Sequence, residues 1–125
     1  EEVFEDYHSG KAGPGHRCVT FLDNEQPIGF AYFAPVEMTD RTWRLWWIAV
    51  SPHTQSRGIG AQLLRYVESE VRQADGRVLF IETSSTPLYE PTRRFYRKHG
   101  YEQDAQLRDF YFDGDDMVVY RKRMR

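Results

Sequence analysis

The sequence lacks the features of several protein classes. Its 125 residues contain one cysteine, Cys18, which excludes an internal disulfide and favours a reducing compartment with an inert thiol in the core. No apolar run approaches the ~20 residues that a membrane-spanning helix needs, and no signal peptide is visible. We therefore expect a soluble, cytoplasmic protein without a membrane partner.

A strong charge of one sign is also lacking. The formal net charge is −2, and we interpret the basic C-terminal residues 121–125 as a solvated chain end rather than a nucleic-acid contact. The four histidines are scattered among predicted loops and a helix end, without the spacing of metal ligands. The composition therefore predicts neither a nucleic-acid partner nor a metal.

The chain does contain enough apolar sequence for one packed domain, residues 1–125, since 40% of its residues are hydrophobic. Residues 1–8 carry apolar side chains at helical spacing, which predicts the last turns of a helix before a loop rich in glycine. Three antiparallel strands are predicted next, at residues 17–22, 28–36 and 42–50.

Helices and strands alternate in the second half. Helical spacing predicts a helix over residues 59–74, and a short apolar strand follows at residues 77–83. A strand, helix and strand in this order make a right-handed crossover, so this strand should lie parallel beside residues 46–50. A helix is predicted next at residues 91–100. Two strands follow at residues 101–108 and 117–121, joined by a hairpin turn around residues 113–114. The fold class is therefore mixed α/β (α+β).

A glycine-containing loop joins the strand ending at Val50 to the helix after it. Gly58 and Gly60 have no Cβ, so backbone can approach a ligand where the helix begins with unpaired N–H groups. These donors and the helix dipole suit a phosphate or pyrophosphate, and Gln55 and Arg57 add side-chain donors. A plain helix-entry turn is the alternative. Neither the P-loop pattern nor the dinucleotide pattern is present.

Three segments give the chain a resemblance to a known family. They are Gln55-Ser56-Arg57-Gly58-Ile59-Gly60 after the strand ending Ile48-Ala49-Val50, the strand 78–82, and Phe95-Tyr96-Arg97-Lys98-His99-Gly100-Tyr101. From about residue 17 to its end, the chain resembles the GCN5-related N-acetyltransferase (GNAT) superfamily. Its final hairpin looks like that of the branch that includes the ribosomal-protein alanine acetyltransferases. The family's first strand and most of its first two helices, which usually form one side of the acceptor site, are expected before Glu1.

The resemblance implies both a fold and an activity. The fold is the acyl-CoA N-acyltransferase fold: a mixed, mostly antiparallel sheet, a central parallel strand pair splayed at the coenzyme A site, and helices on both faces. The activity is direct transfer of an acetyl group from acetyl-CoA to a primary amine of a small molecule, peptide or protein. The alternative is a non-catalytic coenzyme A sensor or interaction domain, a fragment of a larger protein. A homodimer is compatible with either.

The resemblance also assigns the coenzyme site residue by residue. It implies that backbone N–H groups of residues 57–61 hold the pyrophosphate, that residues 48–50 pair with the pantetheine arm, and that an N–H near Ile48 polarises the thioester carbonyl. Tyr89 stands where the family often has an asparagine. The implied coenzyme-binding residues are Ile48, Ala49, Val50, Gln55, Arg57, Gly58, Ile59, Gly60, Ala61 and Tyr89.

Tyr96 and Glu82 are the candidate catalytic residues. Tyr96 aligns with the tyrosine that commonly protonates the departing thiolate, and a phenol of pKa ~10 matches a thiol fairly well. The alternative is a tyrosine that only packs in the core. Glu82, at the end of its strand, is the candidate base, because an attacking ammonium must lose a proton. The alternative is a glutamate that only forms a turn or an ion pair.

Several aromatic residues either pack in the core or line the acceptor pocket, and such a pocket would favour an apolar or aromatic acceptor. Strand alternation predicts Trp46 on one face of the sheet and Trp43 and Trp47 on the other, so at least one should pack under a helix. The residues predicted to line the pocket with the remaining tryptophans are Tyr32, Tyr111 and Phe112. Asp109 and Asp116 either attract a cationic amine or serve solubility at the hairpin end.

Overall fold

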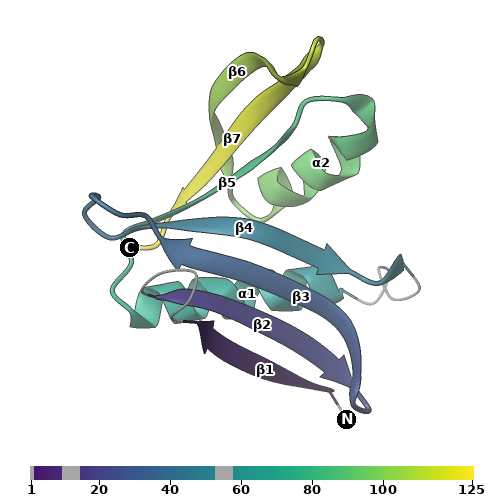
Figure 1. The fold of residues 1–125 in the computed structure, drawn as a ribbon, viewed down its shortest axis with the longest axis vertical. Coiled ribbons are helices and arrows are strands. Elements are labelled where there is room, and N and C mark those ends of the chain that lie inside the picture. Colours follow the sequence, from purple (N-terminus) through teal and green to yellow (C-terminus); the bar gives the residue numbers. More distant parts are fainter. Residues whose placement is uncertain (1, 10–14, 53–57) are drawn as a thin grey trace.

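A seven-stranded sheet with the order β1-β2-β3-β4-β5-β7-β6 carries the fold (Figure 1). The computed structural model describes residues 2–9, 15–52 and 58–125. The strands are β1 Glu2–Ser9, β2 His16–Asp23, β3 Gln26–Pro35, β4 Thr42–Val50, β5 Val78–Ser84, β6 Glu102–Phe112 and β7 Asp115–Arg123. The helices are α1 Ile59–Gln73, the 3-10 helix η2 Pro87–Tyr89, and α2 Glu90–Lys98. The mixed α+β class is confirmed.

Among the described residues, β4 and β5 are the only parallel neighbours in the sheet, and they separate early. Their register runs only from Thr42–Val78 to Arg44–Phe80, after which the strands diverge (Figure 1). The predicted splayed pair is confirmed, but its position is corrected, because residues 46–50 do not lie beside β5. Each strand follows its other neighbour instead: β4 stays paired with β3, and β5 with β7.

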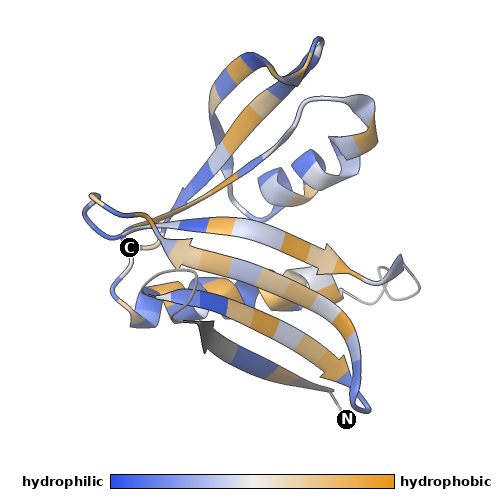
Figure 2. Ribbon diagram, in the orientation of Figure 1, coloured by the Kyte–Doolittle hydropathy of each residue, from blue (hydrophilic) through white to orange (hydrophobic). Residues whose placement is uncertain are grey.

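One hydrophobic cluster lies between the sheet and its helices. The buried residues of α1 recur at helical spacing, as predicted, and α2 adds Tyr96 to the same cluster. Orange segments recur along β2, β3 and β4 (Figure 2). The buried residues that these strands contribute to the cluster are Val19, Phe21, Ala31, Phe33, Trp43 and Leu45. Helices were expected on both faces of the sheet, whereas α1 and α2 share one cluster on one face in the part of the chain that the structure describes.

The opposite face, which we call the open face, follows from strand alternation. Trp43, Leu79 and Ile81 are buried in the cluster, so their neighbours in β4 and β5 point the other way. On β4 and β5 the open face includes Arg44, Trp46, Trp47, Phe80 and Glu82.

A bulge in β4 corrects the predicted placement of the tryptophans. The β3–β4 register shifts at Tyr32, which pairs with Trp47, so Trp46 is the extra residue of the bulged strand. Trp43 packs in the core at 7% exposure, as one tryptophan was predicted to do, whereas Trp46 and Trp47 are 41% and 64% exposed. An inserted residue reverses the facing of the residues after it, so Trp47 does not share the face of Trp43.

The prediction of helical turns at the N-terminus is wrong. Residues 2–9 form β1, which pairs antiparallel with β2 along its whole length. Phe4 packs edge-on against Phe21, with ring centroids 4.9 Å apart, and stacks on Tyr66 at 4.3 Å. A helix of a few residues is only marginally stable, whereas pairing with an adjacent strand gives the same residues a full set of backbone hydrogen bonds.

None of the helices in the described ranges has both the length and the apolar character that crossing a membrane requires.

Candidate active site

The separation of β4 from β5 leaves one edge of β4 available. Ile48, Ala49 and Val50 pair with β3 on one side. Among the described strands, none pairs with their other edge, because β5 pairs with β4 only up to Arg44. An extended molecule carrying amide groups can add to such an edge through backbone hydrogen bonds. The sequence-predicted residues 48–50 therefore form a free strand edge beside an opening in the sheet.

Helix α1 begins directly beyond this edge. Its N-cap Gly58 has φ +73°, in the left-handed region that favours glycine, and no side chain caps the helix in the described ranges. The Gln62 N–H donates to the Gly58 carbonyl at 3.1 Å, so the N–H groups of Ile59, Gly60 and Ala61 precede the first helical bond. With no acidic residue in the first turn, this helix end suits an anion.

Gly60 lies where three elements meet. A Cβ at this position would lie 3.6 Å from the Phe95 ring of α2 and 3.7 Å from Val50 of β4, which is ordinary contact distance. The helix end, the free strand edge and α2 are thus adjacent. Tyr89 ends η2 and precedes α2, with 42% of its surface exposed. Gln55 and Arg57, predicted as further donors, lie outside the described residues.

Tyr96 has its ring in the core and its hydroxyl unbound. The residue is 2% exposed and packs against the rings of Phe95, Tyr101 and Tyr120 at centroid distances of 5.5, 5.9 and 6.0 Å. Its hydroxyl has no hydrogen-bond partner among the described residues. Every fully buried side-chain oxygen or nitrogen in those residues does have a partner, so the Tyr96 hydroxyl is not fully buried. Burial raises the pKa of the Tyr96 phenol above its usual range, so it keeps its proton at neutral pH.

Glu82 points to the open face and is ion-paired. Its Oε1 lies 2.7 Å from Nη2 of Arg44, and the side chains of Arg44 and Glu82 are 27% and 19% exposed. The Arg44 guanidinium lies over the Trp46 ring at 3.5 Å and 5.8 Å from the Phe80 ring. The ion-pair alternative for Glu82 is thus confirmed as a contact, which leaves its role as a base untested.

Arg44 is the site residue that the sequence reasoning missed. Arg44 is the last residue of β4 that pairs with β5, and its register partner there is Phe80. Glu82 lies two residues further along β5 on the same face, within reach of a long side chain. Alternation along the two predicted strands, combined with the correct parallel register, would have identified the pair.

Tyr111 belongs to the edge strand β6. Burial, and then the negative charges of Glu82 and Asp115, raise the pKa of the Tyr111 phenol. Tyr111 belongs to the part of β6 that is out of register with β7, since the pairing jumps between Leu107 and Phe112. Such an irregularity changes the direction in which side chains point.

The acidic residues of this hairpin organise its turn. The Asp109 carboxylate accepts a hydrogen bond from the Gly114 N–H at 2.8 Å, and the Asp109 N–H donates to the Asp116 carboxylate at 2.9 Å. This backbone donor, followed by the Gln106 amide, lowers the pKa of Asp116. Asp109 and Asp116 are therefore engaged within the hairpin, whether or not they also attract an amine.

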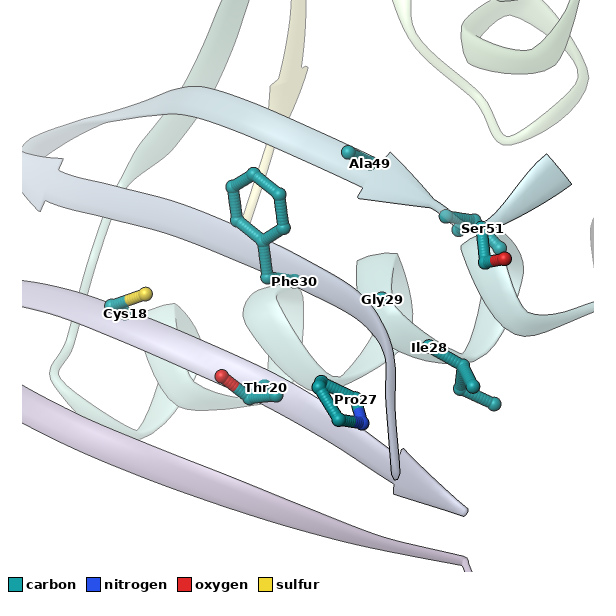
Figure 3. A pocket seen from close by; sticks show the side chains of 9 residues that line it. Cys18, Thr20, Pro27, Ile28, Gly29, Phe30, Ala49 and Ser51 are labelled. Atoms are coloured by element: carbon teal, nitrogen blue, oxygen red, sulfur yellow. The ribbon is translucent and has the colours of Figure 1, made fainter. Parts of the chain in front are cut away.

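A cavity of about 460 Å³ lies on the open face over β2, β3 and β4 (Figure 3). Its lining residues are Cys18, Thr20, Pro27, Ile28, Gly29, Phe30, Ala49, Val50 and Ser51. Cys18 was expected in the core but lines this cavity, because its neighbour Val19 takes the buried position in β2. Burial raises the pKa of the Cys18 thiol, which keeps it protonated. Within the described ranges no group of three or more His, Cys, Asp or Glu side chains is placed to hold a metal ion.

A sequence model of the acetyltransferase (GNAT) domain matches residues 14–103. The chain belongs to the GNAT acetyltransferase family. A curated relative, S-(2-succino)cysteine N-acetyltransferase of Bacillus subtilis (strain 168), is 27% identical over 62 residues, which are 50% of this chain. The chain spans only 38% of the length of that relative.

Solved structures agree with this assignment. The crystal structure of a protein assigned to the GNAT acetyltransferases in Desulfovibrio desulfuricans is 41% identical, with a TM-score of 0.87 over 89% of this chain and 70% of that one. A GNAT acetyltransferase from Elizabethkingia anophelis, solved with acetyl-CoA bound, is 18% identical, with a TM-score of 0.82 over 98% of this chain and 97% of that one. The acyl-CoA N-acyltransferase fold implied by the sequence is therefore confirmed.

Proposed function

We propose that the protein is an N-acetyltransferase that moves the acetyl group of acetyl-CoA to a primary amine. The observation that carries this proposal is the junction of a free β4 edge with the uncapped start of α1, beside the opening between β4 and β5. Family membership supports the reaction class, the Elizabethkingia protein was solved with acetyl-CoA, and the curated relative acts as an N-acetyltransferase. We assign acetyl-CoA as the co-substrate, without a metal.

We assign the coenzyme to this junction as follows. The N–H groups of Ile59, Gly60 and Ala61 receive the pyrophosphate, because the start of α1 presents them without a capping side chain. The pantetheine arm pairs with the free edge of residues 48–50 as an added strand. We propose that Gln55, Arg57 and Tyr89 make further contacts to the coenzyme.

The proposed reaction forms one bond and breaks another. The amine nitrogen attacks the thioester carbonyl carbon, the C–N bond forms, and the C–S bond breaks to release the coenzyme thiolate. The ammonium first loses one proton to Glu82, directly or through water, and the nitrogen loses a second proton to water after the attack. The thiolate takes the Tyr96 proton, and water returns a proton to Tyr96. An N–H near Ile48 would stabilise the carbonyl oxygen, and such a donor is typically worth about 3 kcal/mol of barrier.

The positions of the two candidate groups are compatible with this chemistry. Tyr96 belongs to the cluster on the helix side of the sheet, whereas Glu82 points to the open face. A thioester lying in the opening between β4 and β5 would therefore have the acid on one side and the base on the other. Neither role needs the two side chains to contact each other.

A second function, a non-catalytic coenzyme A sensor, is favoured by one observation. Glu82, the candidate base, already forms an ion pair with Arg44 through Oε1. The two functions are separated by measuring thiol release from acetyl-CoA with a panel of primary amines. Turnover above the hydrolysis rate supports the enzyme. Coenzyme binding in calorimetry without turnover on any amine would refute it and support the sensor.

We also propose a cellular compartment and an oligomeric state for the protein. The cytoplasm is proposed because acetyl-CoA and a free thiol suit a reducing compartment. A homodimer is proposed because β6 is an edge strand whose residues are exposed along its length. Sedimentation analysis distinguishes a dimer from a monomer.

A further inference from the structure

The ion pair on the open face places opposite charges side by side, next to the opening proposed for the thioester. Arg44 and Glu82 are 2.7 Å apart, Nη2 to Oε1, at the point where β4 and β5 separate. Both side chains are partly exposed, at 27% and 19%, so a small molecule can reach them. The Trp46 ring lies 3.5 Å from the guanidinium carbon and stacks on its flat face, so the N–H edge that pairs with Glu82 does not point at the ring.

A simple amine is a poor match for this arrangement. Its ammonium would have to take the Glu82 carboxylate from Arg44, leaving a partly buried guanidinium without that partner. Removing one member of such a pair costs more than the pair itself contributes, because the other charge stays desolvated. An acceptor that carries an ammonium and a carboxylate replaces both partners at once. Its carboxylate pairs with Arg44 while its ammonium pairs with Glu82, and no charge is left alone.

We propose that the acceptor is an amino acid with a free carboxylate, which Arg44 binds while Glu82 receives the proton from the amino group. This inference rests on the proposed acetyltransferase function and adds the substrate class. Arginine suits the task because its planar fork binds a carboxylate through two parallel hydrogen bonds. Only the amino nitrogen is acetylated, and the acceptor carboxylate is unchanged. Arg44 is thus a specificity-determining residue on the acceptor side.

Two tryptophans follow Arg44 along β4. The rings of Trp46 and Trp47, which are 41% and 64% exposed, offer apolar contact to the acceptor side chain.

The experiment compares acceptors that differ only in the carboxylate. L-phenylalanine is paired with 2-phenylethylamine, and L-leucine with 3-methylbutylamine, and kcat/KM for thiol release is measured for each with saturating acetyl-CoA. A charged carboxylate bound by arginine is worth at least about tenfold, so the amino acid of at least one pair should exceed its amine by that factor. The carboxamide of the same amino acid should behave like the amine.

The variants test whether Arg44 is the cause. Arg44→Gln should reduce the preference for the amino acid to about twofold or less, and Arg44→Lys should keep part of it because the charge remains. Arg41→Gln is the matched control, since Arg41 also pairs with carboxylates, Asp40 and Asp75, but in the segment before β4. Its preference should equal that of the unmodified protein. Thermal unfolding establishes that each variant is folded.

The outcomes separate this inference from the proposed function. If the unmodified protein acetylates the amine of every pair as well as the amino acid, the inference is overturned while the acetyltransferase function stands. If a tenfold preference exists but survives Arg44→Gln in a folded protein, Arg44 is not the determinant and the inference is again overturned. If acetyl-CoA binds and no amine of either kind is acetylated, the proposed function fails, and the substrate class fails with it.

Discussion

Removing the hydroxyl of Tyr96 distinguishes a proton donor from a core tyrosine. The structure offers matched controls, because Tyr101 and Tyr120 belong to the same cluster but have bonded hydroxyls. The Tyr101 hydroxyl donates to Glu68 at 2.7 Å, and the Tyr120 hydroxyl accepts from Arg97 at 3.1 Å. The Tyr96 hydroxyl has no such partner among the described residues.

These contacts determine the expected free energies of unfolding. Tyr96→Phe keeps the ring and breaks no described hydrogen bond, so the free energy of unfolding should change by about 0.5 kcal/mol or less. Tyr101→Phe removes a partner of the buried Glu68 carboxylate, which should cost about 1–3 kcal/mol. Tyr120→Phe should cost about 1 kcal/mol, because the Arg97 side chain that it binds is 47% exposed and retains contact with water.

The expected order of activities is the reverse. If Tyr96 protonates the thiolate, Tyr96→Phe should lower kcat about 100-fold or more, which is about 3 kcal/mol of barrier, with coenzyme affinity unchanged. Tyr101→Phe and Tyr120→Phe should keep kcat within about threefold, since no proton transfer is assigned to them. Thiol-release kinetics, urea unfolding and coenzyme calorimetry on the three variants provide the measurements.

Two results would refute the reasoning about Tyr96. An unchanged kcat in Tyr96→Phe would remove the phenol as the acid. An equally large loss of kcat in Tyr101→Phe would mean that the packing of this cluster, rather than one hydroxyl, controls turnover.

Three further predictions concern the site and its surroundings. Glu82→Gln should lower kcat most at neutral pH and least at high pH, where the amine is already deprotonated; a loss that is equal at every pH would exclude Glu82 as the base. Gly58→Ala should lower the free energy of unfolding by about 1–2 kcal/mol, because φ is +73° there, and Gly114→Ala, at φ +82°, should do the same without weakening coenzyme binding. Burial lowers the pKa of His99, so the unfolded chain binds its proton first, and stability should fall as the pH drops below about 6.5. His99→Gln should flatten that slope in urea unfolding between neutral and acidic pH, and an unchanged slope would contradict the assignment.

Periodicity and turn chemistry located most elements of the fold. The helix predicted over residues 59–74 is α1 at Ile59–Gln73, and the strand predicted at residues 42–50 is β4 at Thr42–Val50. Both carry apolar residues on one face over several turns or pairs, and that pattern reflects burial directly. The prediction failed for the N-terminal residues because a short apolar spacing fits a helix and an edge strand equally well. Pairing with β2 makes this segment a strand.

Some features of the candidate site could likewise be predicted from the sequence, and others could not. The sequence by itself determined the family, the uncapped glycine start of α1, and the candidates Tyr96 and Glu82, because these depend on residue type and on spacing within one segment. Only the tertiary structure decided that the bulge in β4 exposes Trp47 and that Glu82 meets Arg44. Both depend on the register between strands far apart in the chain and on where β4 and β5 separate. Backbone pairing with neighbouring strands sets those two properties, and no local pattern encodes them.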